Sequence, residues 1–385
     1  PIFHFLSQFD FPFSNLFRYV TFRAGAAAAV AFFLSLLLGR PLVAALRRWK
    51  AGQHVRTGEE MRAIAHDAKE GTPTMGGLLI VSTTLLSTLL FGDLSNPPLW
   101  LVLSTMLAMG GIGFWDDLAK LRHRSSDGLS VKQKLLLQGL WMLAAFAAIE
   151  AIPSLAAHAQ ELMVPFCKTA VWTMPLPVAA VFFYLVLVGT TNAVNLTDGL
   201  DGLAAGCAAS ALGTYAAFAY VAGHAALAAY LQIPAISLAH EVAIVCSAAA
   251  GACLGFLWWN AYPARVFMGD TGSEALGGLL AMAAIVTKQE LCLLIVGGLF
   301  LCEELSVMVQ TGACRWHRWR TGEGLPQDKR PFLMTPLHHH CEILAKRHAA
   351  EEGRDTRSAE NAVVVRFWIL SIVAAVAGLA TLKIR

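Results

Sequence analysis

Charged side chains are scarce in this sequence: Asp, Glu, Lys and Arg make up 14% of its 385 residues. Soluble proteins average about 25% charged residues, so this deficit argues against a soluble domain. An excess of positive charge is also lacking, because the formal net charge is only +3. The near balance excludes a nucleic-acid binder whose affinity depends on bulk charge, and nucleic acid is therefore not an expected partner.

Cysteine occurs without the spacing that would give it a structural role. The 8 Cys residues include no CxxC pair and fall mostly inside apolar runs. They favour small buried side chains over a redox or zinc framework. The absence of such a framework argues against a disulfide-stapled secreted module, and the apolar composition argues against a disordered chain.

Apolar side chains are abundant, at 56% of the residues, with a mean hydropathy of +0.57. A bilayer-spanning helix needs about 20 such residues in succession. The apolar runs are approximately 20–46, 74–92, 97–115, 134–152, 174–191, 202–222, 240–258, 274–287, 291–313 and 363–382. The sequence predicts an all-α, polytopic membrane protein with about ten transmembrane helices, in one integral-membrane domain over residues 1–385.

Lys and Arg are unevenly distributed among the loops between these runs. The loops after odd-numbered runs hold 23 of them, whereas the other loops and both termini together hold six. Cytoplasmic loops carry the excess of positive charge, which predicts cytoplasmic odd loops and two periplasmic termini. The polar motifs lie in or beside the odd loops, so we expect the site in a cleft on the cytoplasmic face.

The first motif is Lys69-Glu-Gly-Thr-Pro-Thr-Met-Gly-Gly77, before the second apolar run. Thr72 and Pro73 fit the N-cap and first turn of a helix that opens this span. A helix N-terminus with Lys69 nearby can hold an anion. A capped span with an unrelated interfacial Lys is the plain alternative.

The second motif, Phe114-Trp-Asp-Asp-Leu-Ala-Lys120, ends the third run, and Lys132 and Lys134 follow it. Its adjacent carboxylates, Asp116 and Asp117, cost free energy at a membrane boundary unless a metal, Lys or water compensates them. The motif therefore favours a functional site, with a solvated helix end as the alternative.

The third motif joins the fifth and sixth runs without a basic residue. Asn192, Asn195, Asp198 and Asp201 recur every three residues, so a helical stretch would place them on one face. Their oxygens suit Mg²⁺ or hydrogen bonds to a sugar or nucleobase. Alternatively, they simply end two helices.

The fourth motif combines Asn260 with Phe267-Met-Gly-Asp270-Thr-Gly-Ser273, which opens the eighth run. Glycines on both sides of Asp270 let the backbone approach a ligand, and Asp is a natural Mg²⁺ ligand where substrate phosphates complete the shell. A plain turn is the alternative reading of this motif.

The fifth motif, Pro336-Leu-His338-His339-His340-Cys341-Glu342, lies in the long basic loop. Three His and a Cys could form a zinc site. Consecutive residues point in different directions, however, so we favour contacts with phosphates or carboxylates.

Together the five motifs supply Asp for a metal, Lys and His for phosphate charge, and Asn for recognition, which is the set that phosphoryl transfer needs. Across nearly the whole chain, their order and spacing resemble the MraY family of phospho-N-acetylmuramoyl-pentapeptide transferases, within the polyprenyl-phosphate N-acetylhexosamine-1-phosphate transferase superfamily. The matching segments are GTPTMGG, FWDDLAK, TNAVNLTDGLDGLAAG, RVFMGDTGS and PLHHHCE.

The resemblance implies that undecaprenyl phosphate attacks UDP-MurNAc-pentapeptide, giving lipid I and UMP with Mg²⁺ required. It also implies a place in the bacterial inner membrane and a possible homodimer. A WecA-like GlcNAc-1-phosphate transferase is the alternative enzyme, and a secondary transporter is the alternative of another class. Direct attack and a two-step route through an Asp-linked intermediate are both compatible with the sequence.

The resemblance also implies roles for individual residues. Asp270 is expected to be the metal ligand and Asp117 the base, with Asp116, Asp198 and Asp201 in support. Contacts with phosphates or the sugar and peptide are implied for Lys69, Thr74, Lys132, His338, His339 and His340, with His339 and Lys69 in the catalytic group. Substrate binding is further implied for Asn192, Asn195, Gly199, Leu200, Asn260 and Phe267, most of them around the nucleoside.

Three residues depart from the family pattern: Glu274, Glu304 after Glu303, and Cys341. None removes a proposed ligand, so they bear on local packing. In addition, Gly251-Ala-Cys-Leu-Gly255 is a GxxxG motif, for which we expect internal helix packing rather than a dimer face.

Overall fold

The computed structural model describes residues 14–49, 71–123, 128–353, 355–356 and 358–384. Its helices are η1 (Ser14–Arg18), α2 (Val20–Arg48), α4 (Gly77–Phe91), α5 (Pro97–His123), α6 (Val131–Ala151), α7 (Pro153–Ala156), α8 (Leu176–Thr197), α9 (Leu203–Ala222), α10 (Ala225–Leu231), η3 (Ala239–Glu241), α11 (Val242–Asn260), α12 (Gly269–Thr287), α13 (Leu293–Val296), α14 (Gly298–Thr321), η4 (Gln327–Lys329), α15 (Leu337–Glu351) and α16 (Ser358–Ala380).

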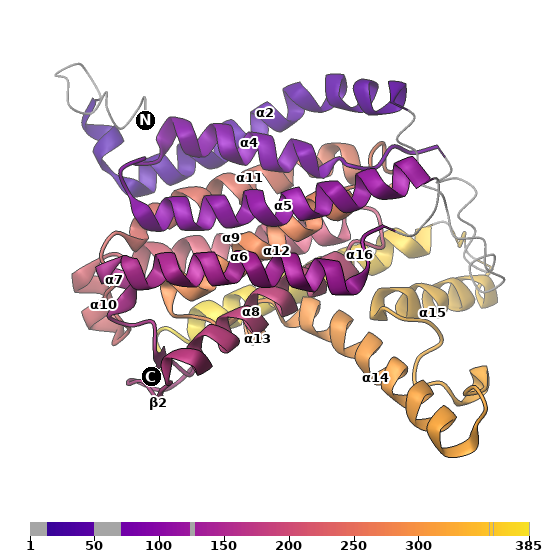
Figure 1. Cartoon of the computed structure of the whole chain (residues 1–385). Coiled ribbons are helices and arrows are strands. Elements are labelled where there is room, and N and C mark those ends of the chain that lie inside the picture. Colours follow the sequence, from indigo (N-terminus) through magenta and orange to yellow (C-terminus); the bar gives the residue numbers. More distant parts are fainter. Residues whose placement is uncertain (1–13, 50–70, 124–127, 354, 357, 385) are drawn as a thin grey trace.

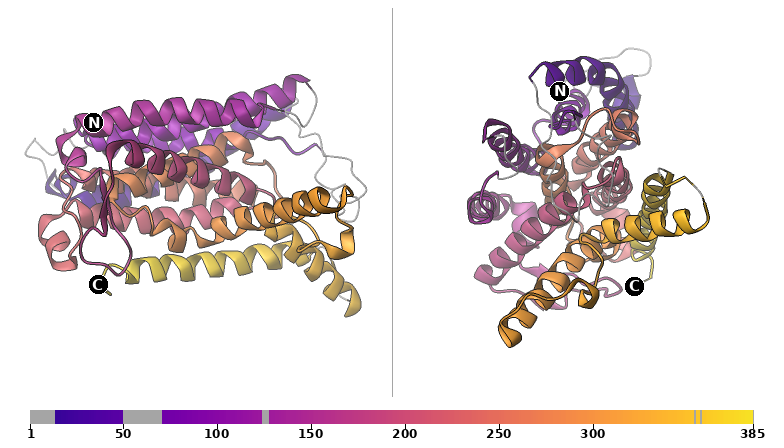
Figure 2. Two further views of the ribbon diagram at one scale, coloured as in Figure 1. Left: turned by 60° about the horizontal axis from the view of Figure 1, so that its bottom comes forward. Right: turned by 90° about the vertical axis from the view of Figure 1, so that its right-hand side faces the viewer.

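The long helices lie side by side in an elongated bundle (Figure 1). Strands β1 (Glu161–Leu162) and β2 (Trp172–Thr173) pair antiparallel in the connection between α7 and α8. η1 and the C-terminal end of α16 reach the same end of the bundle, whereas α14 leans away from it near the other end (Figures 1 and 2). Each of the apolar runs falls on helix, so the all-α prediction is confirmed.

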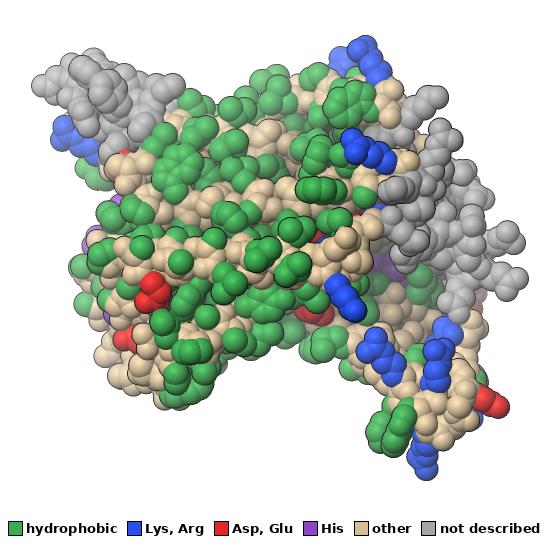
Figure 3. Space-filling view, in the orientation of Figure 1, with side chains coloured by type: hydrophobic (Ala, Val, Ile, Leu, Met, Phe, Trp, Pro, Cys, Tyr) green, Lys and Arg blue, Asp and Glu red, His purple; other side chains and the backbone are tan. Residues whose placement is uncertain are grey.

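Within the described residues, seven helices are long and apolar enough to cross a membrane: Val20–Arg48, Pro97–Arg122, Val131–Ala151, Leu176–Thr197, Leu203–Ala222, Ala239–Asn260 and Ser358–Ala380. The apolar helix α4 is shorter than these. The visible flank of the bundle is covered mostly with apolar side chains, and Lys and Arg gather toward the end from which α14 leans (Figure 3).

Helix α12 is the centre of the bundle. It packs against α4, α5, α8 and α9, and every residue from Thr271 to Thr287 is buried. Small residues let its neighbours approach closely: a Cβ atom on Gly277 would lie 2.5 Å from the Cα of Thr191 on α8. Because protein surrounds α12 on all sides, its first turns can carry polar residues that a lipid-facing helix could not.

Two helix boundaries differ from those expected. Helix α4 begins at Gly77, so Thr72 and Pro73 are not its N-cap and first turn as predicted. The backbone of this segment is hydrogen-bonded to another loop, described below, and these bonds keep the segment out of the helix. The ninth run is broken into α13 and α14 at Gly297, and α14 continues to Thr321, beyond the end of the apolar run at 313.

The GxxxG motif of α11 packs inside the protein. A Cβ atom on Gly251 would lie 2.1 Å from the carbonyl oxygen of Ala28, and one on Gly255 would lie 2.6 Å from that of Phe32. Both carbonyls belong to α2, so the glycines bring α11 and α2 into close backbone contact. The expectation of internal packing is confirmed.

A buried ion pair fastens the end of the bundle where η1 lies. The guanidinium of Arg23 on α2 donates to both carboxylate oxygens of Glu241, with 2.9 Å to Oε2, and to the carbonyl oxygen of Phe91 at 3.0 Å. Glu241 Oε2 also accepts from the backbone N–H of Asp93 at 2.8 Å. The pair therefore joins α2, the α4–α5 connection and the start of α11.

Replacing Arg23 with Met should destabilise the protein by about 3–5 kcal/mol, because it leaves the Glu241 carboxylate buried without its partner. Thermal unfolding in detergent measures the loss. The double variant Arg23→Met, Glu241→Met should recover part of it, since both charges are then removed. Equal stability of Arg23→Met and the wild type would show that this pair does not hold the three segments together.

Candidate functional site

The site is built around the N-terminus of α12, where backbone amides need acceptors. The carboxylate of Asp117 on α5 accepts from the amides of Asp270 and Thr271 at 3.1 and 2.9 Å and from Thr271 Oγ1 at 2.6 Å. A carboxylate at this position is favoured by the positive end of the helix dipole. Asp117 is 3% exposed, so it works as a buried cap that joins α5 to α12.

Backbone pairing brings the first and fourth motifs together. The Phe267 N–H donates to the carbonyl of Pro73, and the N–H groups of Gly76 and Gly77 donate to the carbonyls of Phe267 and Met268, each at 2.8 Å. These bonds explain why the helix does not start at Thr72. The short ladder places Thr74 beside the start of α12.

Gly269 makes this close approach possible. Its φ of +72° lies in the left-handed region, which glycine adopts without strain. A Cβ atom there would lie 2.8 Å from both Asp117 Oδ2 and Thr74 Oγ1. The glycine before Asp270 therefore serves the contact between motifs, as its position in the sequence suggested.

Two lysines lie among the carboxylates. Lys120 Nζ is 2.6 Å from Asp116 Oδ2 and 3.1 Å from Asp270 Oδ2. Lys134 Nζ is 2.6 Å from Asp270 Oδ2, 3.3 Å from Asp116 Oδ2 and 3.0 Å from Glu274 Oε1. Helices α5, α6 and α12 thus each contribute charge to one network, which we call the carboxylate–lysine cluster.

The loop between α8 and α9 supplies a further carboxylate. Asp198 follows the last residue of α8, and desolvation, with the neighbouring charges of Asp270 and Asp117, raises its pKa well above the ordinary value. The backbone of Gly269 opposes this rise through a hydrogen bond. Asp198 therefore lies beside the start of α12, although the helical face that was predicted to carry Asn192, Asn195, Asp198 and Asp201 ends at Thr197.

His338 approaches the same loop from α15. Its Nδ1 lies 3.1 Å from Glu303 Oε2, and its backbone N–H donates to the same oxygen at 3.2 Å. Burial lowers the pKa of His338 below its ordinary value, while Glu303 opposes the change. Both side chains are fully buried, and His338 Nε2 has no hydrogen-bond partner.

The free edge of this imidazole meets Gly199. A Cβ atom on Gly199 would lie 2.1 Å from His338 Nε2. Glycine is therefore required between Asp198 and Leu200 because the His338 ring occupies the space of a side chain. This contact joins the third motif to the fifth.

The other two histidines turn to different partners, as expected for consecutive residues. His339 Nδ1 lies 3.2 Å from Glu342 Oε2. His340 Nδ1 accepts from the N–H of Leu333 at 3.1 Å, and its ring packs edge-on against Phe332. Although burial opposes ionisation of Glu342, hydrogen bonds from His339 and Lys346 lower its pKa to about 2.

Several predicted residues form side-chain hydrogen bonds to the backbone around the site. Asn260 accepts from the N–H of Gly202 at 3.0 Å and donates to the carbonyl of Val266 at 2.9 Å. Asp201 accepts from the N–H of Ala264 at 2.9 Å. Asn192 donates to the carbonyl of Val188, one turn earlier in α8. The bonds of Asn260 and Asp201 order the two loops that carry Asp198 and Phe267, whereas the bond of Asn192 lies within α8.

The remaining predicted residues have different surroundings. Leu200 is buried, Asn195 and Phe267 are partly buried, and Lys132 is exposed at the start of α6. Lys69 lies outside the described residues. Thus Thr74, Asp116, Asp117, Asp198 and Asp270 converge on the start of α12, with His338 next to them, whereas Lys132 does not join the cluster.

Four members of the site were not among the predicted site residues: Lys120, Lys134, Thr271 and Glu303. Lys120 stands four residues after Asp116, the spacing of an ion pair on one helical face, so the sequence held a signal for it. Lys134 and Lys132 are two residues apart and point to opposite sides of α6. Only the packing of α6 decides which of them faces the carboxylates.

The donor set fits a hard divalent cation. Mg²⁺ prefers oxygen ligands and is usually bound through one or two carboxylates, waters and substrate phosphates rather than by a complete protein cage. In the described residues, no group of three His, Cys, Asp or Glu side chains forms such a cage. Asp270, whose side chain is 15% exposed, could still supply one carboxylate, with Asp198 close by.

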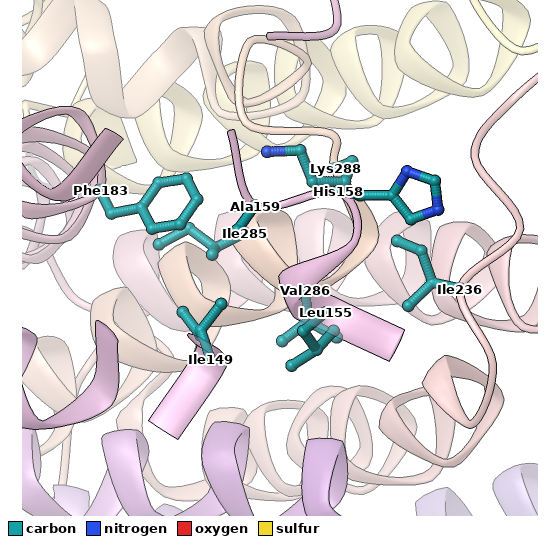
Figure 4. A pocket seen from close by; sticks show the side chains of 9 residues that line it. All are labelled: Ile149, Leu155, His158, Ala159, Phe183, Ile236, Ile285, Val286 and Lys288. Carbon is teal, nitrogen blue, oxygen red and sulfur yellow. The ribbon is translucent and has the colours of Figure 1, made fainter. Parts of the chain in front are cut away.

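The protein also has a separate small pocket (Figure 4). It is lined mainly by apolar residues, together with His158 and Lys288. Lys288 directly follows the C-terminal end of α12, so the length of the helix, about 27 Å at 1.5 Å per residue, separates the pocket from the cluster. The candidate site is therefore the charged cluster and not this pocket.

Replacing Gly199 with Ala should lower turnover by about 10²-fold, because the new methyl group must displace His338 and shift the loop that carries Asp198. Gly189→Ala is the matched control, since a Cβ atom at this position of α8 would meet nothing within 4 Å. Steady-state rates of both variants test the contact. A Gly199→Ala protein with the rate of the control would contradict it.

The pKa of His338 predicts a pH dependence of stability. Because burial lowers this pKa below 6.5, the unfolded chain binds more protons than the folded protein as pH falls through 6.5, and folding is weakened. The melting temperature should therefore fall between pH 7.5 and 5.5, and it should fall less in His338→Gln. Identical pH profiles would contradict the buried neutral imidazole.

Comparison with known proteins connects this geometry to a family. Residues 99–288 match the family model "Glycosyl transferase family 4", and residues 69–81 match "Phospho-N-acetylmuramoyl-pentapeptide-transferase signature 1". The chain is 46% identical over 377 residues to the phospho-N-acetylmuramoyl-pentapeptide-transferase of Methylacidiphilum infernorum, and 45% identical over 373 and 375 residues to those of Neisseria gonorrhoeae and Desulfotalea psychrophila. Each match covers 96% of both chains. The chain therefore belongs to the phospho-N-acetylmuramoyl-pentapeptide-transferase family.

Proposed function

We propose that this protein transfers phospho-MurNAc-pentapeptide from UDP-MurNAc-pentapeptide to undecaprenyl phosphate, forming lipid I and UMP. Its membership of the family supports this reaction. The observation that carries the proposal is the convergence of carboxylates from α5, the α8–α9 loop and α12 with Lys120 and Lys134. A transfer between two phosphate-bearing substrates needs positive charge for their oxygens and carboxylates for a metal or a proton.

The proposal includes Mg²⁺, held by Asp270 with Asp198 as a second carboxylate. Asp270 is more accessible than Asp116, with side chains 15% and 2% exposed. When bound, the ion would neutralise charge on the pyrophosphate and on the departing UMP. Lys120 and Lys134 lie beside Asp270, so their ammonium groups would meet phosphate oxygens brought to that carboxylate.

In the transfer, an oxygen of the lipid phosphate bonds to the sugar-linked phosphorus, and the bond from that phosphorus to the oxygen of UMP breaks. A proton left on the lipid phosphate, whose second ionisation lies near pH 6, must go to a base. Asp117 is our candidate for this base. Its three hydrogen bonds to the start of α12 support a second role, in which it positions the backbone of Asp270.

We further propose ten membrane spans, with both termini in the periplasm and the cluster at the cytoplasmic face of the bacterial inner membrane. The three helical segments added to the seven clear spans are α4, α12 and α13 with α14. The loops rich in Lys and Arg support this orientation, as does the gathering of basic side chains at one end (Figure 3). A homodimer remains a prediction, to which the α11 glycines add nothing, since they pack against α2.

The purified protein should release UMP when supplied with both substrates and Mg²⁺, and it should fail to do so with UDP-GlcNAc in place of UDP-MurNAc-pentapeptide. Chromatography of UMP and of the lipid product measures this. Consumption of UDP-GlcNAc alone would favour the GlcNAc-1-phosphate transferase instead.

Asp270→Ala should abolish turnover at low millimolar Mg²⁺, and retained turnover would contradict the metal assignment.

The variants Asp117→Asn and Asp270→Asn separate the two aspartates. If Asp117 is the base, its loss should lower kcat by about 10²–10⁴-fold while nucleotide-sugar binding changes little. Raising the pH should then restore part of the rate, because an ionised lipid phosphate needs no base. Asp270→Asn should respond to added Mg²⁺ instead. Rescue of Asp117→Asn by Mg²⁺ but not by pH would assign Asp117 to the metal site.

A further inference from the structure

Glu274 is a buried carboxylate one turn after Asp270 on α12. It is 1% exposed, and its Oε1 lies 3.0 Å from Lys134 Nζ. Its other oxygen, Oε2, has no hydrogen-bond partner. Residues four apart share a helix face, so Asp270 and Glu274 present their carboxylates to the same lysine. The proposed reaction gives Glu274 no role.

The distances show a competition for Lys134. Its ammonium lies 2.6 Å from Asp270, 3.0 Å from Glu274 and 3.3 Å from Asp116. A divalent cation at Asp270 must displace this ammonium from the carboxylate that both ions would share. The displaced charge stays partly buried, since the Lys134 side chain is 16% exposed, and a buried charge needs another partner.

We propose that Glu274 is a positioning residue that retains Lys134 when a divalent cation takes Asp270. Its carboxylate accepts the ammonium and so lowers the cost of releasing Asp270. Without Glu274, two ammonium groups share two carboxylates, and Lys134 holds Asp270 more strongly. This inference rests on the proposed function only in taking Asp270 as the metal ligand.

Mn²⁺ is a suitable probe, because the free ion is measured directly by electron paramagnetic resonance and no turnover is needed. The full-length protein in detergent is titrated with Mn²⁺ in the presence of UMP, whose phosphate can complete the coordination of the ion, and without the lipid substrate. We expect Glu274→Leu to weaken Mn²⁺ binding by about tenfold, because Lys134 then has one carboxylate partner fewer and stays on Asp270. Glu274→Gln keeps the shape and an acceptor for Lys134, so it should lie between Leu and the wild type. It also provides the test if the Leu variant does not fold.

A double variant tests whether Glu274 acts through Lys134. In a Lys134→Met background, Glu274→Leu should change Mn²⁺ affinity little, because the competing ammonium is already gone. A structural effect, or direct ligation by Glu274, would instead give the same loss in both backgrounds and would overturn the inference.

Glu150→Leu is the matched control. It removes a partly buried carboxylate from α6, the helix that carries Lys134, about 24 Å farther along the axis. It should leave Mn²⁺ affinity unchanged, and an equal loss in this control would overturn a specific role for Glu274. If the wild type binds no Mn²⁺, the metal assignment of Asp270 fails and the inference with it. If the wild type binds Mn²⁺ and Glu274→Leu does so equally well, only the role of Glu274 fails.

Discussion

The candidate site depends on the buried N-terminus of α12. The first amides of a helix have no acceptor within the helix, and a buried end cannot use water. Asp117 supplies the acceptor from α5, and its hydrogen bonds fix α5 against α12, which is buried along nearly its whole length. Once Asp117 is placed, Asp116 and Lys120 follow on the same helix, and Lys134 adds a second positive charge from α6. The need for hydrogen-bond acceptors at the N-terminus of α12 thus brings the charged side chains of the site together.

Two kinds of buried charge occur in this bundle, and the comparison explains why only one end resembles a catalytic site. Toward the end with η1, Arg23 pairs with Glu241, and Lys288 pairs with Glu290 at 2.6 Å. In each of these pairs the Arg or Lys side chain is bonded to the carboxylate of one residue. At the other end, two lysines are shared among three carboxylates, with Asp198 close by. In such a shared network, a lysine that loses one carboxylate to a ligand still has another within reach.

The segment containing α14 and α15 adds the second half of the site. It leaves the bundle at α14 and returns so that His338 packs against Gly199 and pairs with Glu303. The imidazole is thereby held next to the loop of Asp198 without being part of the carboxylate–lysine cluster. The break at Gly297 lets α14 take its own direction, and α15 then brings His338 to the loop of Asp198.

The sequence by itself determined the helical class, the approximate positions of the long apolar helices and the motifs that supply the site, because apolar runs and the order of polar residues are local properties. It read the polar stretch that forms α15 (Leu337–Glu351) as loop, because that helix has no apolar run to mark it. It placed Asp116, Asp117, Asp198 and Asp270 in one site through the resemblance of their motifs to a family. It placed the start of α4 wrongly, since the pairing of Pro73 with Phe267 is a contact between distant segments. Only the tertiary structure showed that Thr271 and Glu303 belong to the site, and that Lys134 faces the carboxylates whereas Lys132 does not. Helical periodicity defines the faces of a helix, but which face meets which neighbour depends on how all the helices pack.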